Sequence, residues 1–509
     1  MREHDSTERR EPTPPIELTG TADRLAGPGP GAALDEGFIA ALSAICPVDA
    51  TETGTAEASR DWWPLAMHWA LAGSVPRRAG LVARPSTTEH VSAIARLCYE
   101  SRIPLTVAGG RSGVCGASVP VFGGVVLDTT ALQGVLSVDA ESGLVEVLPG
   151  TFGPDLEAFI GAEHALTVGH FPQSFDIATV GGWVACRGAG QYSTRYGKIE
   201  DIVCGLEVVL ADGSVIVTGG SPAAAVGPDL DQLFLGSEGT LGIITRVWLR
   251  AHPRPATERR AAFSFPTFET GLEACRQIVR RGATPAVLRL YDAAESQRGQ
   301  GGDGTQCMLL VLDEGDPLLV DAVMTIVADV VGALEATDLG ADLVEQWMHH
   351  RNDTSALQAL THKGFVVDTM EIAAPWSKLP GIFDTARAAL LEVPHARVAT
   401  CHLSHSYVDG ACLYFTFAAT PPADEVESTY VALWDAGQRA VLAGGGNLSH
   451  HHGIGLNRSR FLAEALGSAH EVLVALKDAL DPRGILNPGK LSLPSPFGDV
   501  EWPVRTVVG

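Results

Sequence analysis

The sequence is short of positive charge. Against 60 Asp and Glu residues it has only 36 Lys and Arg, which gives a formal net charge of −24 over 509 residues. A surface of this sign repels nucleic acid and anionic membranes over long range. Nucleic acid is therefore excluded as a partner, membrane contact is at most peripheral, and an acidic substrate would need basic residues gathered at its own site.

The sequence also lacks paired cysteines. No two of its nine cysteines form a CxxC pair, and their number is odd. Single thiols of this kind are typical of reduced, buried cysteines, so we expect a cytoplasmic protein in which no cysteine is a reactive thiolate. They stand at positions 46, 98, 115, 186, 204, 275, 307, 401 and 412.

The two ends of the chain show no long apolar run and no targeting signal. Residues 1–35 are rich in charge, proline and glycine, and no run of signal or membrane-spanning length follows Arg9 and Arg10. The last residues, RTVVG, contain neither a peroxisomal tripeptide nor a lipidation box. We expect residues 1–35 to form a flexible tail.

The first half of the chain alternates short apolar runs with glycine. Ser86 to Arg102 begins with a Ser-x-x-Glu capping box at Ser86 and Glu89 and continues with apolar residues at helical spacing, which predicts an amphipathic helix. The runs IPLTVAGG, GGVVLDTT and GLVEVLPG predict strands. The Ala-Asp-Gly in IVCGLEVVLADGSVIVTGG predicts a β-hairpin. This half is therefore mixed α/β.

The composition changes near residue 252. Longer helical patterns follow, ETGLEACRQIVRRG, which should end at Gly282, and DAVMTIVADVVGALEA. Glycine returns at 444–455, and SAHEVLVALKDALDPRGILNPGKL then predicts one helix and a segment rich in proline and glycine. We expect two large domains, the first split by the second. The predicted limits are 1–60 for the N-terminal tail and lead-in, 61–252 for the first domain, 253–440 for the inserted domain, 441–495 for the returning segment and 496–509 for a tail.

A glycine-rich turn, VAGGRSGVCG at 107–116, is suited to binding phosphate. Glycines let successive backbone N–H groups turn toward one anion, and Ser112 can add a hydroxyl donor. Taken alone, an ordinary turn is the commoner explanation. The Rossmann-like spacing GPGPGA at 27–32 lies in the proline-rich tail and is set aside.

Three further segments resemble, in order, the FAD signature of flavoproteins of the vanillyl-alcohol-oxidase and p-cresol-methylhydroxylase type. They are FPQSFDIATVGGWVACRGAGQYSTRYGKIEDIV at 171–203, GSEGTLGIIT at 236–245 and DPRGILNPGKL at 481–491. The resemblance implies an α+β fold, in which a FAD-binding domain of two α/β subdomains carries an inserted α/β cap domain. It also implies a C-terminal return to the FAD domain, in agreement with the split domain.

The resemblance implies a FAD contact for fifteen residues. It places the pyrophosphate loop at 109–113, the passage along the flavin and diphosphate at 172–182, and contacts near the adenosine at 238–244. Some members attach FAD to a histidine in the first glycine loop, which has none here, so we expect non-covalent FAD. The fifteen residues are Gly109, Gly110, Arg111, Ser112, Gly113, Pro172, Ser174, Thr179, Val180, Gly181, Gly182, Glu238, Gly239, Gly242 and Ile244.

Within this family the chain is most similar to the alkylglycerone-phosphate synthase branch. The shared segments are TVGGWVACRGAG, IEDIV, VLRLYD, DGACLYFTF and GGGNLSHHHGIG. The resemblance implies that Tyr414 is an acid or base and that His450, His451 and His452 line the active site. It makes Arg289 and Arg351 candidates for anchoring substrate or for structural roles.

The three consecutive histidines could instead hold a metal, but the spacing of the potential ligands does not favour a metal site. Neighbours on an extended segment point to opposite faces, so the three are not expected to converge on one ion. Related 2-hydroxy-acid dehydrogenases that use a metal carry a His-x-Gly-Asp-Gly-Asn-x-His run and a Glu-His pair. Here His405 is kept, but Tyr414 falls roughly where the later histidine belongs and His451 where the glutamate belongs. We therefore predict no metal.

Simpler explanations stay open for several of these side chains. Tyr414 could be an ordinary strand aromatic, Arg289 could pair with Asp292, and Arg351 could belong to a solvated basic patch. Proton transfer by Tyr414 with a histidine is attractive because imidazole titrates near neutral pH, and because a cation can lower the pKa of a phenol.

Three functions fit these observations. The first is exchange of the acyl group of acyl-dihydroxyacetone phosphate for a fatty alcohol through a flavin N5 adduct. The second is FAD-dependent oxidation of a hydroxy acid or another alcohol, as a dehydrogenase or oxidase. The third, a flavin-binding subunit without activity, fits the intact Tyr and His set least. We expect a small-molecule substrate and a homodimer.

Overall fold

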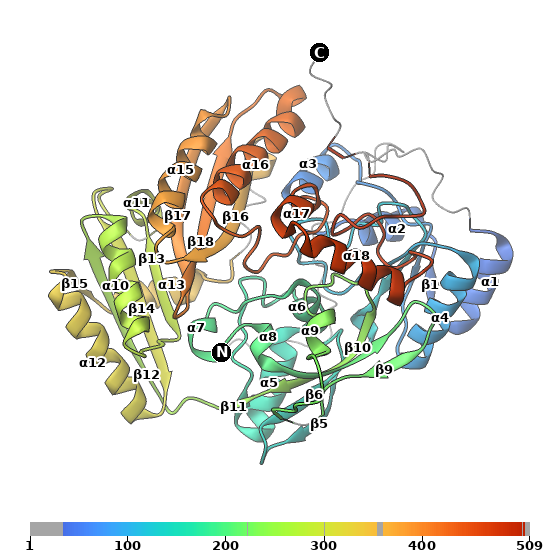
Figure 1. Cartoon of the computed structure of the whole chain (residues 1–509), viewed down its shortest axis with the longest axis horizontal. Helices are drawn as coiled ribbons and strands as arrows, with labels where there is room; N and C mark the ends of the chain where they lie inside the picture. The colour runs from blue at the N-terminus through green and yellow to red at the C-terminus, as the bar shows by residue number, and fades with distance from the viewer. Residues whose placement is uncertain (1–33, 221, 300, 354–359, 501, 504–509) are drawn as a thin grey trace.

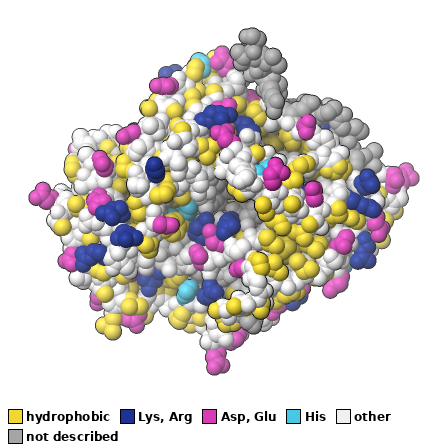
Figure 2. Space-filling view, in the orientation of Figure 1, with side chains coloured by type: hydrophobic (Ala, Val, Ile, Leu, Met, Phe, Trp, Pro, Cys, Tyr) yellow, Lys and Arg dark blue, Asp and Glu magenta, His cyan; other side chains and the backbone are white. Residues whose placement is uncertain are grey.

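The computed structural model describes residues 34–220, 222–299, 301–353, 360–500, 502 and 503. Within them the chain forms two parts (Figure 1), one built mainly from the first 250 residues and one around a large sheet of later residues. Acidic side chains are spread over the whole face seen in Figure 2 rather than gathered in one place. No helix of the described chain is long and apolar enough to cross a membrane.

The first sheet has four strands, of which three are parallel. Their order is β1 (Val48–Asp49), β2 (Leu81–Ala83), β4 (Val125–Asp128) and β3 (Leu105–Ala108), with β1 antiparallel. Helices α1 (Glu36–Ile45) and α4 (Thr88–Ser101) share a core with it. Two short helices, α2 (Glu52–Ala58) and α3 (Pro64–Leu71), lie between β1 and β2 along the chain.

The predicted helix at 86–102 is confirmed, but the predicted cap is wrong. Thr87 has extended backbone, and its hydroxyl accepts the N–H of His90 at 3.2 Å, so Thr87 caps the helix in place of Ser86. Residue 86 lies one position too early for its side chain to reach the first turn.

The second sheet has five antiparallel strands. Their order is β5 (Val135–Asp139), β6 (Leu144–Val147), β10 (Ile243–Arg250), β8 (Val203–Val209) and β9 (Val215–Val217). The predicted hairpin is the β8–β9 pair, closed by the N–H of Leu210 donating to Ser214 O at 2.8 Å. Helices α5 (Gly153–His164), α6 (Val180–Cys186), α8 (Ile199–Ile202) and α9 (Asp231–Phe234) pack on this sheet. Helix α7 (Ser193–Tyr196) precedes α8, and β7 (Leu166–Thr167) pairs with β11 (His252–Pro253).

The third sheet has seven strands and forms the other part. The order is β15 (Thr337–Gly340), β12 (Thr257–Phe265), β14 (Cys307–Gly315), β13 (Val287–Tyr291), β17 (Ala396–Ser406), β18 (Gly410–Ala419) and β16 (Val366–Pro375). Helices α10 (Phe268–Arg280), α12 (Pro317–Ala333), α15 (Leu379–Glu392) and α16 (Val426–Ala443) bury their apolar residues on it (Figure 1). Helices α11 (Ala293–Gly299) and α13 (Asp342–His350) lie within the same part.

The end of the chain returns to the first part, as predicted for a split domain. After α17 (Ser459–Leu466) and α18 (Ala469–Leu480), Leu486 bridges Leu105 of β3 and lies in the core of the first sheet. Within the expected C-terminal tail, Trp502 is buried and its ring packs edge-on against Trp63, with centroids 4.9 Å apart. Nearly all of the expected tail 1–35 lies outside the described residues.

Candidate active site

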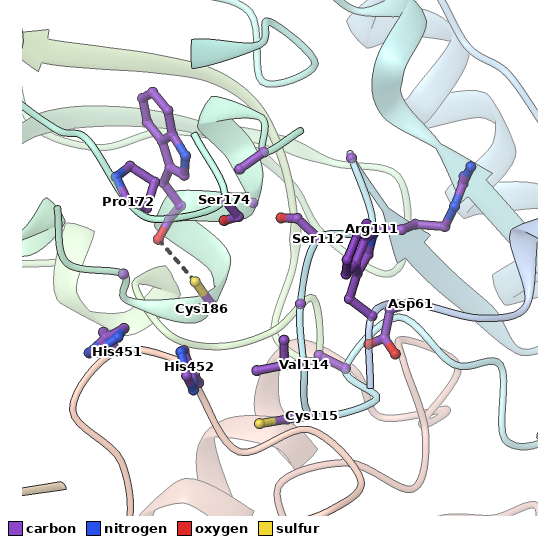
Figure 3. Close-up of a pocket in the computed structure, with 18 of the residues that line it drawn as sticks. Asp61, Arg111, Ser112, Val114, Cys115, Pro172, Ser174, Cys186, His451 and His452 are labelled. Atoms are coloured by element: carbon purple, nitrogen blue, oxygen red, sulfur yellow. Dashed lines mark hydrogen bonds between the residues drawn. The ribbon is translucent and has the colours of Figure 1, made fainter. Parts of the chain in front are cut away.

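A cavity of 590 Å³ lies between the glycine-rich segments and the seven-stranded sheet (Figure 3). Fourteen of the fifteen residues predicted to hold the cofactor line it, together with Tyr414, His451 and His452. Val180 does not, because its side chain is fully buried in the core of the second sheet. In Figure 3 the hydroxyl of Ser112 points toward the segment that carries Ser174.

Glycine is required where the two segments meet. A Cβ on Gly110 would overlap the carbonyl oxygen of Ile177, and one on Gly109 would overlap the hydroxyl of Thr179. The turn after β3 therefore lies directly against the chain that leads into α6, and together they form one wall of the cavity.

The cavity wall carries polar atoms that lack a partner within the described chain. An unpaired buried polar atom costs about 1–3 kcal/mol, so this wall is suited to a ligand with both donors and acceptors. FAD has such groups along its whole length, so the residues present fit it. The atoms are Asp61 Oδ2, Trp62 Nε1, both ring nitrogens of His170, Thr179 Oγ1 and Trp183 Nε1.

A buried glutamate on β16 holds the histidine segment against the sheet. Glu371 is fully buried and accepts hydrogen bonds from the backbone N–H of His452 at 2.7 Å and from the Ser449 hydroxyl at 2.5 Å. The guanidinium of Arg458 donates to both of its carboxylate oxygens. Burial opposes its charge, yet Arg458 and His452 hold the pKa of Glu371 well below its usual range. In the sequence, the single sign of this role is a charged residue within an apolar strand.

A second buried carboxylate holds the other end of the same segment. Glu238 accepts the backbone N–H groups of Ile454 at 2.6 Å and Gly455 at 2.9 Å. Glu238 was predicted to contact the cofactor. It does line the cavity, but its carboxylate is engaged by these two N–H groups. The histidine segment is thus fixed between the two parts of the molecule.

The three histidines do not have equal positions. His450 does not line the cavity, because its ring bonds to the Tyr407 hydroxyl through Nε2 at 2.7 Å and to His451 Nδ1 through Nδ1 at 2.8 Å. The expectation that neighbouring rings point apart is wrong for this pair, because the segment is a series of bends and not an extended strand. His450 therefore supports His451, which with His452 reaches the cavity.

Tyr414 lies beside these histidines on the cavity face of β18. Its hydroxyl donates to Thr369 Oγ1 at 3.0 Å, and its ring stacks on His402 with centroids 4.7 Å apart. Burial raises the pKa of Tyr414, and burial with the neighbouring His452 lowers the pKa of His451 well below its usual range. The site therefore pairs a neutral phenol with a neutral imidazole. The Arg289 cation does act to lower the pKa of Tyr414, but burial outweighs it, so the net change is a rise.

Neither predicted anchoring arginine lines the cavity. Arg289 donates to the Tyr291 hydroxyl at 2.7 Å and contacts His402 Nε2 at 2.6 Å, and it makes no pair with Asp292. Arg351 donates to Gln191 Oε1 at 2.9 Å and covers the ring of Tyr192. Both guanidinium groups therefore contact side chains of neighbouring elements and do not face the cavity.

The arginine of the seven-stranded part that does line the cavity is Arg298, on α11. Its side chain is 54% exposed and lies 3.5 Å from the Glu295 carboxylate. Sequence reasoning missed it because its surroundings, ESQRGQ, match no motif.

Four side chains near the cavity converge in a way that a metal site could use. Potential ligand atoms of His405, Cys412, His450 and His451 all lie within 4.8 Å of one another. Cys412, and not Tyr414, stands opposite His405 in the strand register, which corrects the sequence comparison. Both ring nitrogens of His405 are already bonded, to Ser404 Oγ at 2.7 Å and Gly190 O at 3.1 Å. The absence of a metal stays a prediction.

Replacing Arg458 should destabilise the protein in a pH-dependent way. Arg458→Met removes the buried guanidinium that binds both oxygens of Glu371, so we expect the free energy of unfolding at pH 7 to fall by about 3–5 kcal/mol. With Arg458 present, the lowered pKa of Glu371 adds stability at pH values above that of an unfolded glutamate, about 4.3, and this stability is lost as pH falls through the folded pKa. Without Arg458 the buried carboxylate protonates readily, so the difference between wild type and variant should narrow between pH 7 and pH 4.5.

Denaturant titrations at the two pH values measure this difference. Arg439→Met is the matched control, since Arg439 makes an exposed pair with Glu464 and should cost less than about 1 kcal/mol. Equal effects of the two substitutions would contradict the role assigned to the Glu371–Arg458 pair.

Removal of metal should leave the protein unchanged. Because both ring nitrogens of His405 and His450 are bonded within the protein, we expect treatment with a chelator to alter neither the flavin spectrum nor turnover. Elemental analysis of the purified protein should find no stoichiometric zinc or manganese. Activity that is lost on chelation and restored by either ion would overturn this prediction.

Comparison with known proteins agrees with the geometry. Residues 79–219 match the family described as FAD binding domain, and residues 254–491 match the C-terminal domain of FAD linked oxidases. The uncharacterized FAD-linked oxidoreductase YgcU of Escherichia coli (strain K12) is 32% identical over 432 residues, 81% of this chain and 88% of that protein. Alkyldihydroxyacetonephosphate synthase of Dictyostelium discoideum is 28% identical over 456 residues, 82% and 74% of the two chains.

The fold is also found in a solved structure. A solved structure of an alkyldihydroxyacetonephosphate synthase superposes on this chain with a TM-score of 0.76 at 24% identity. The match covers 94% of this chain and 89% of the other. The α+β fold, the FAD cofactor and the resemblance to the synthase branch, all predicted from sequence, are confirmed. The chain belongs to the FAD-linked oxidase family of flavoproteins and is a FAD-dependent enzyme.

Proposed function

We propose that the protein is a FAD-dependent oxidoreductase that oxidises the hydroxyl group of a small alcohol or hydroxy acid. The observation that carries this proposal is the scarcity of cations at the cavity. Among the described residues that line it, the Lys and Arg side chains are Arg111, in the glycine-rich turn, and Arg298. The Arg298 guanidinium is exposed and paired with Glu295.

A doubly charged phosphate would require more than these two groups provide. Phosphate sites use several charge-assisted hydrogen bonds, often from a bidentate arginine, and the net charge of −24 adds no general attraction. A neutral or singly charged substrate suits the wall formed by Tyr414, His451 and His452 better.

Two neutral side chains can handle the substrate hydroxyl. Bound FAD would supply the acceptor for the hydride that leaves the substrate carbon. The Tyr414 phenol, kept neutral by burial, can donate a hydrogen bond to the substrate oxygen. The neutral His451 imidazole can accept the hydroxyl proton. His452 Nδ1 lies 3.0 Å from Glu371 Oε2, so that carboxylate can stabilise positive charge that develops on the histidines.

A second candidate is the exchange of an acyl group for a fatty alcohol on a dihydroxyacetone phosphate ester. The similarity to alkyldihydroxyacetonephosphate synthases over most of the chain favours it, as does the presence of Tyr414 and two of the three histidines at one cavity. The same proton-handling residues would serve either reaction, so the residues themselves do not separate the two.

The cavity floor indicates which substrates would fit. Side chains of β16, β18 and β17 form cross-strand rows that become less polar with distance from the histidines. The rows are Glu371, Tyr414 and His402, then Thr369, Thr416 and Thr400, then Val367, Ala418 and Val398. The members that line the cavity are Tyr414, Thr369, Thr416, Val367, Ala418 and Val398. We infer a substrate whose hydroxyl lies at the first row and whose apolar tail lies over the third.

Anaerobic mixing tests the reaction type. Oxidation of an alcohol or 2-hydroxy acid should bleach the long-wavelength flavin band, and air or an added electron acceptor should restore it. Tyr414→Phe should slow bleaching by roughly 10²-fold and His451→Ala or His452→Ala by at least as much, with all three proteins still yellow. Arg439→Met is the control and should react as wild type does.

A different outcome would favour the second candidate. If a panel of alcohols and hydroxy acids leaves the band intact, while acyl-dihydroxyacetone phosphate forms an adduct and incorporates a fatty alcohol, the oxidoreductase proposal is wrong.

Substitution in the third row tests the position of the substrate tail. Ala418→Leu fills space above β18, so kcat/KM for a long-tailed 2-hydroxy acid should fall about tenfold more than for a short one. The short substrate is the internal control. Equal losses for both chain lengths would show that the tail lies elsewhere.

A further inference from the structure

Asp61 lies at the cavity, and one of its carboxylate oxygens accepts no hydrogen bond of normal geometry from the described residues. The residue lies between α2 and α3, is 1% exposed and lines the cavity. Its Oδ1 accepts the N–H of Trp63 at 3.1 Å, whereas Oδ2 has no partner within the described chain. Figure 3 shows Asp61 beside the turn that carries Arg111 and Ser112.

The position of Asp61 relative to this turn is fixed by the backbone. The N–H of Trp62, the next residue, donates to Gly113 O at 2.8 Å. A Cβ on Gly113 would lie 3.7 Å from Asp61 Oδ2, which is ordinary van der Waals contact. The free oxygen therefore lies directly next to the glycine-rich turn.

The nearby positive charge does not satisfy this oxygen. Lys490 is fully buried, but its ammonium group donates to Val119 O at 2.6 Å and to Asn487 Oδ1 at 3.5 Å. Burial raises the pKa of Asp61 to about 7, against the opposing effects of the Trp63 N–H, of Lys490 and of the Gly116 N–H. A buried carboxylate with one oxygen that lacks a hydrogen bond is stabilised by any hydrogen-bond donor that enters the cavity.

The chemistry of FAD narrows down what that donor is. The donors of FAD are the hydroxyls of the ribityl chain and of the adenosine ribose, the adenine amino group and the N3–H of the flavin ring. A glycine-rich turn is suited to the pyrophosphate, which lies in the middle of the molecule. The sugar hydroxyls flank the pyrophosphate, while the other two donors lie at the ends of the molecule. A carboxylate that faced the phosphates themselves would repel them.

We propose that Asp61 is a FAD-binding residue that accepts a hydrogen bond from a sugar hydroxyl of the cofactor. Acidic residues bind ribose hydroxyls in this way in other dinucleotide sites. The proposal concerns cofactor recognition and holds whichever reaction the enzyme catalyses. Asp61 lies outside both matched family segments, which begin at residue 79.

Titration of the apoprotein with FAD tests the proposal. In Asp61→Ala the dissociation constant for FAD should rise roughly 10- to 100-fold, because a hydrogen bond to a charged group is lost. Asp61→Asn keeps the shape and the acceptor for the Trp63 N–H but removes the charge, so a smaller rise of about 3- to 10-fold is expected. Quenching of flavin fluorescence measures both values.

Asp313→Asn is the matched control. Asp313 is equally buried and also has one carboxylate oxygen without a hydrogen bond, but it lies on β14 and does not line the cavity. Its substitution should leave the affinity for FAD unchanged. Circular dichroism and the melting temperature of each apoprotein show that the variants are folded, and Asp61→Asn decides the question if Asp61→Ala does not fold.

Titration with FMN identifies which sugar is bound. If Asp61 binds the ribityl chain, its substitution should weaken FMN and FAD by the same factor, and if it binds the adenosine ribose, only FAD should be affected. Unchanged FAD affinity in folded Asp61→Asn and Asp61→Ala would overturn the proposal. Tighter binding would do so too, since it would mean that the carboxylate faces the phosphates.

Discussion

The active site depends on one buried ion pair. Glu371 and Arg458 are both fully buried, and Glu371 also accepts hydrogen bonds from the segment that carries the histidines. Taking two charges out of water costs several kcal/mol each, so such a pair is retained only where its geometry is good and the remaining lone pairs are used. Here the lone pairs are used to position His451 and His452. The main role of the pair is therefore to position the histidines, because the cost of taking its charges out of water offsets much of the stability that the pair gives the fold.

The opposite end of the same segment is held by a second buried acid. Glu238 comes from the first part of the molecule and Glu371 from the seven-stranded sheet, so the histidine segment is bonded to both. Motion of one part against the other would break hydrogen bonds at one of these carboxylates. The relative position of the cofactor wall and the histidines is thus set by hydrogen bonds that neither histidine side chain provides.

Sequence reasoning predicted the parts of the site that depend on local pattern or on family resemblance. Gly109 and Gly110, which were predicted to contact the cofactor, line the cavity at a turn where only glycine permits the close approach. Tyr414 was predicted at the site from the resemblance alone, because its strand pattern by itself indicates an ordinary strand aromatic. Glu371 could not be found, because its partners are 78 to 87 residues away and a glutamate in a strand has no local signature. The contact of Arg289 with His402 could not be predicted for the same reason, because His402 lies on another strand 113 residues away, whereas Tyr291 lies two residues along the same strand.

The wall of the cavity that contains the glycine-rich turn after β3 is also completed by segments far apart in the chain. The turn after β3 receives the N–H of Trp62 at Gly113 O, and that of Leu456 at Cys115 O. Just before it, the Asn487 N–H donates to Leu105 O. Residues from before the first matched family segment and from the last hundred residues are therefore both needed to close this wall. The contacts of Leu456 and Asn487 close loops of several hundred residues, and folding of the large sheet that lies between the partners lowers the entropy that this closure costs. The segment 61–252 alone would keep the contact from Trp62 but would lack those from Leu456 and Asn487, so the FAD site depends on the whole chain.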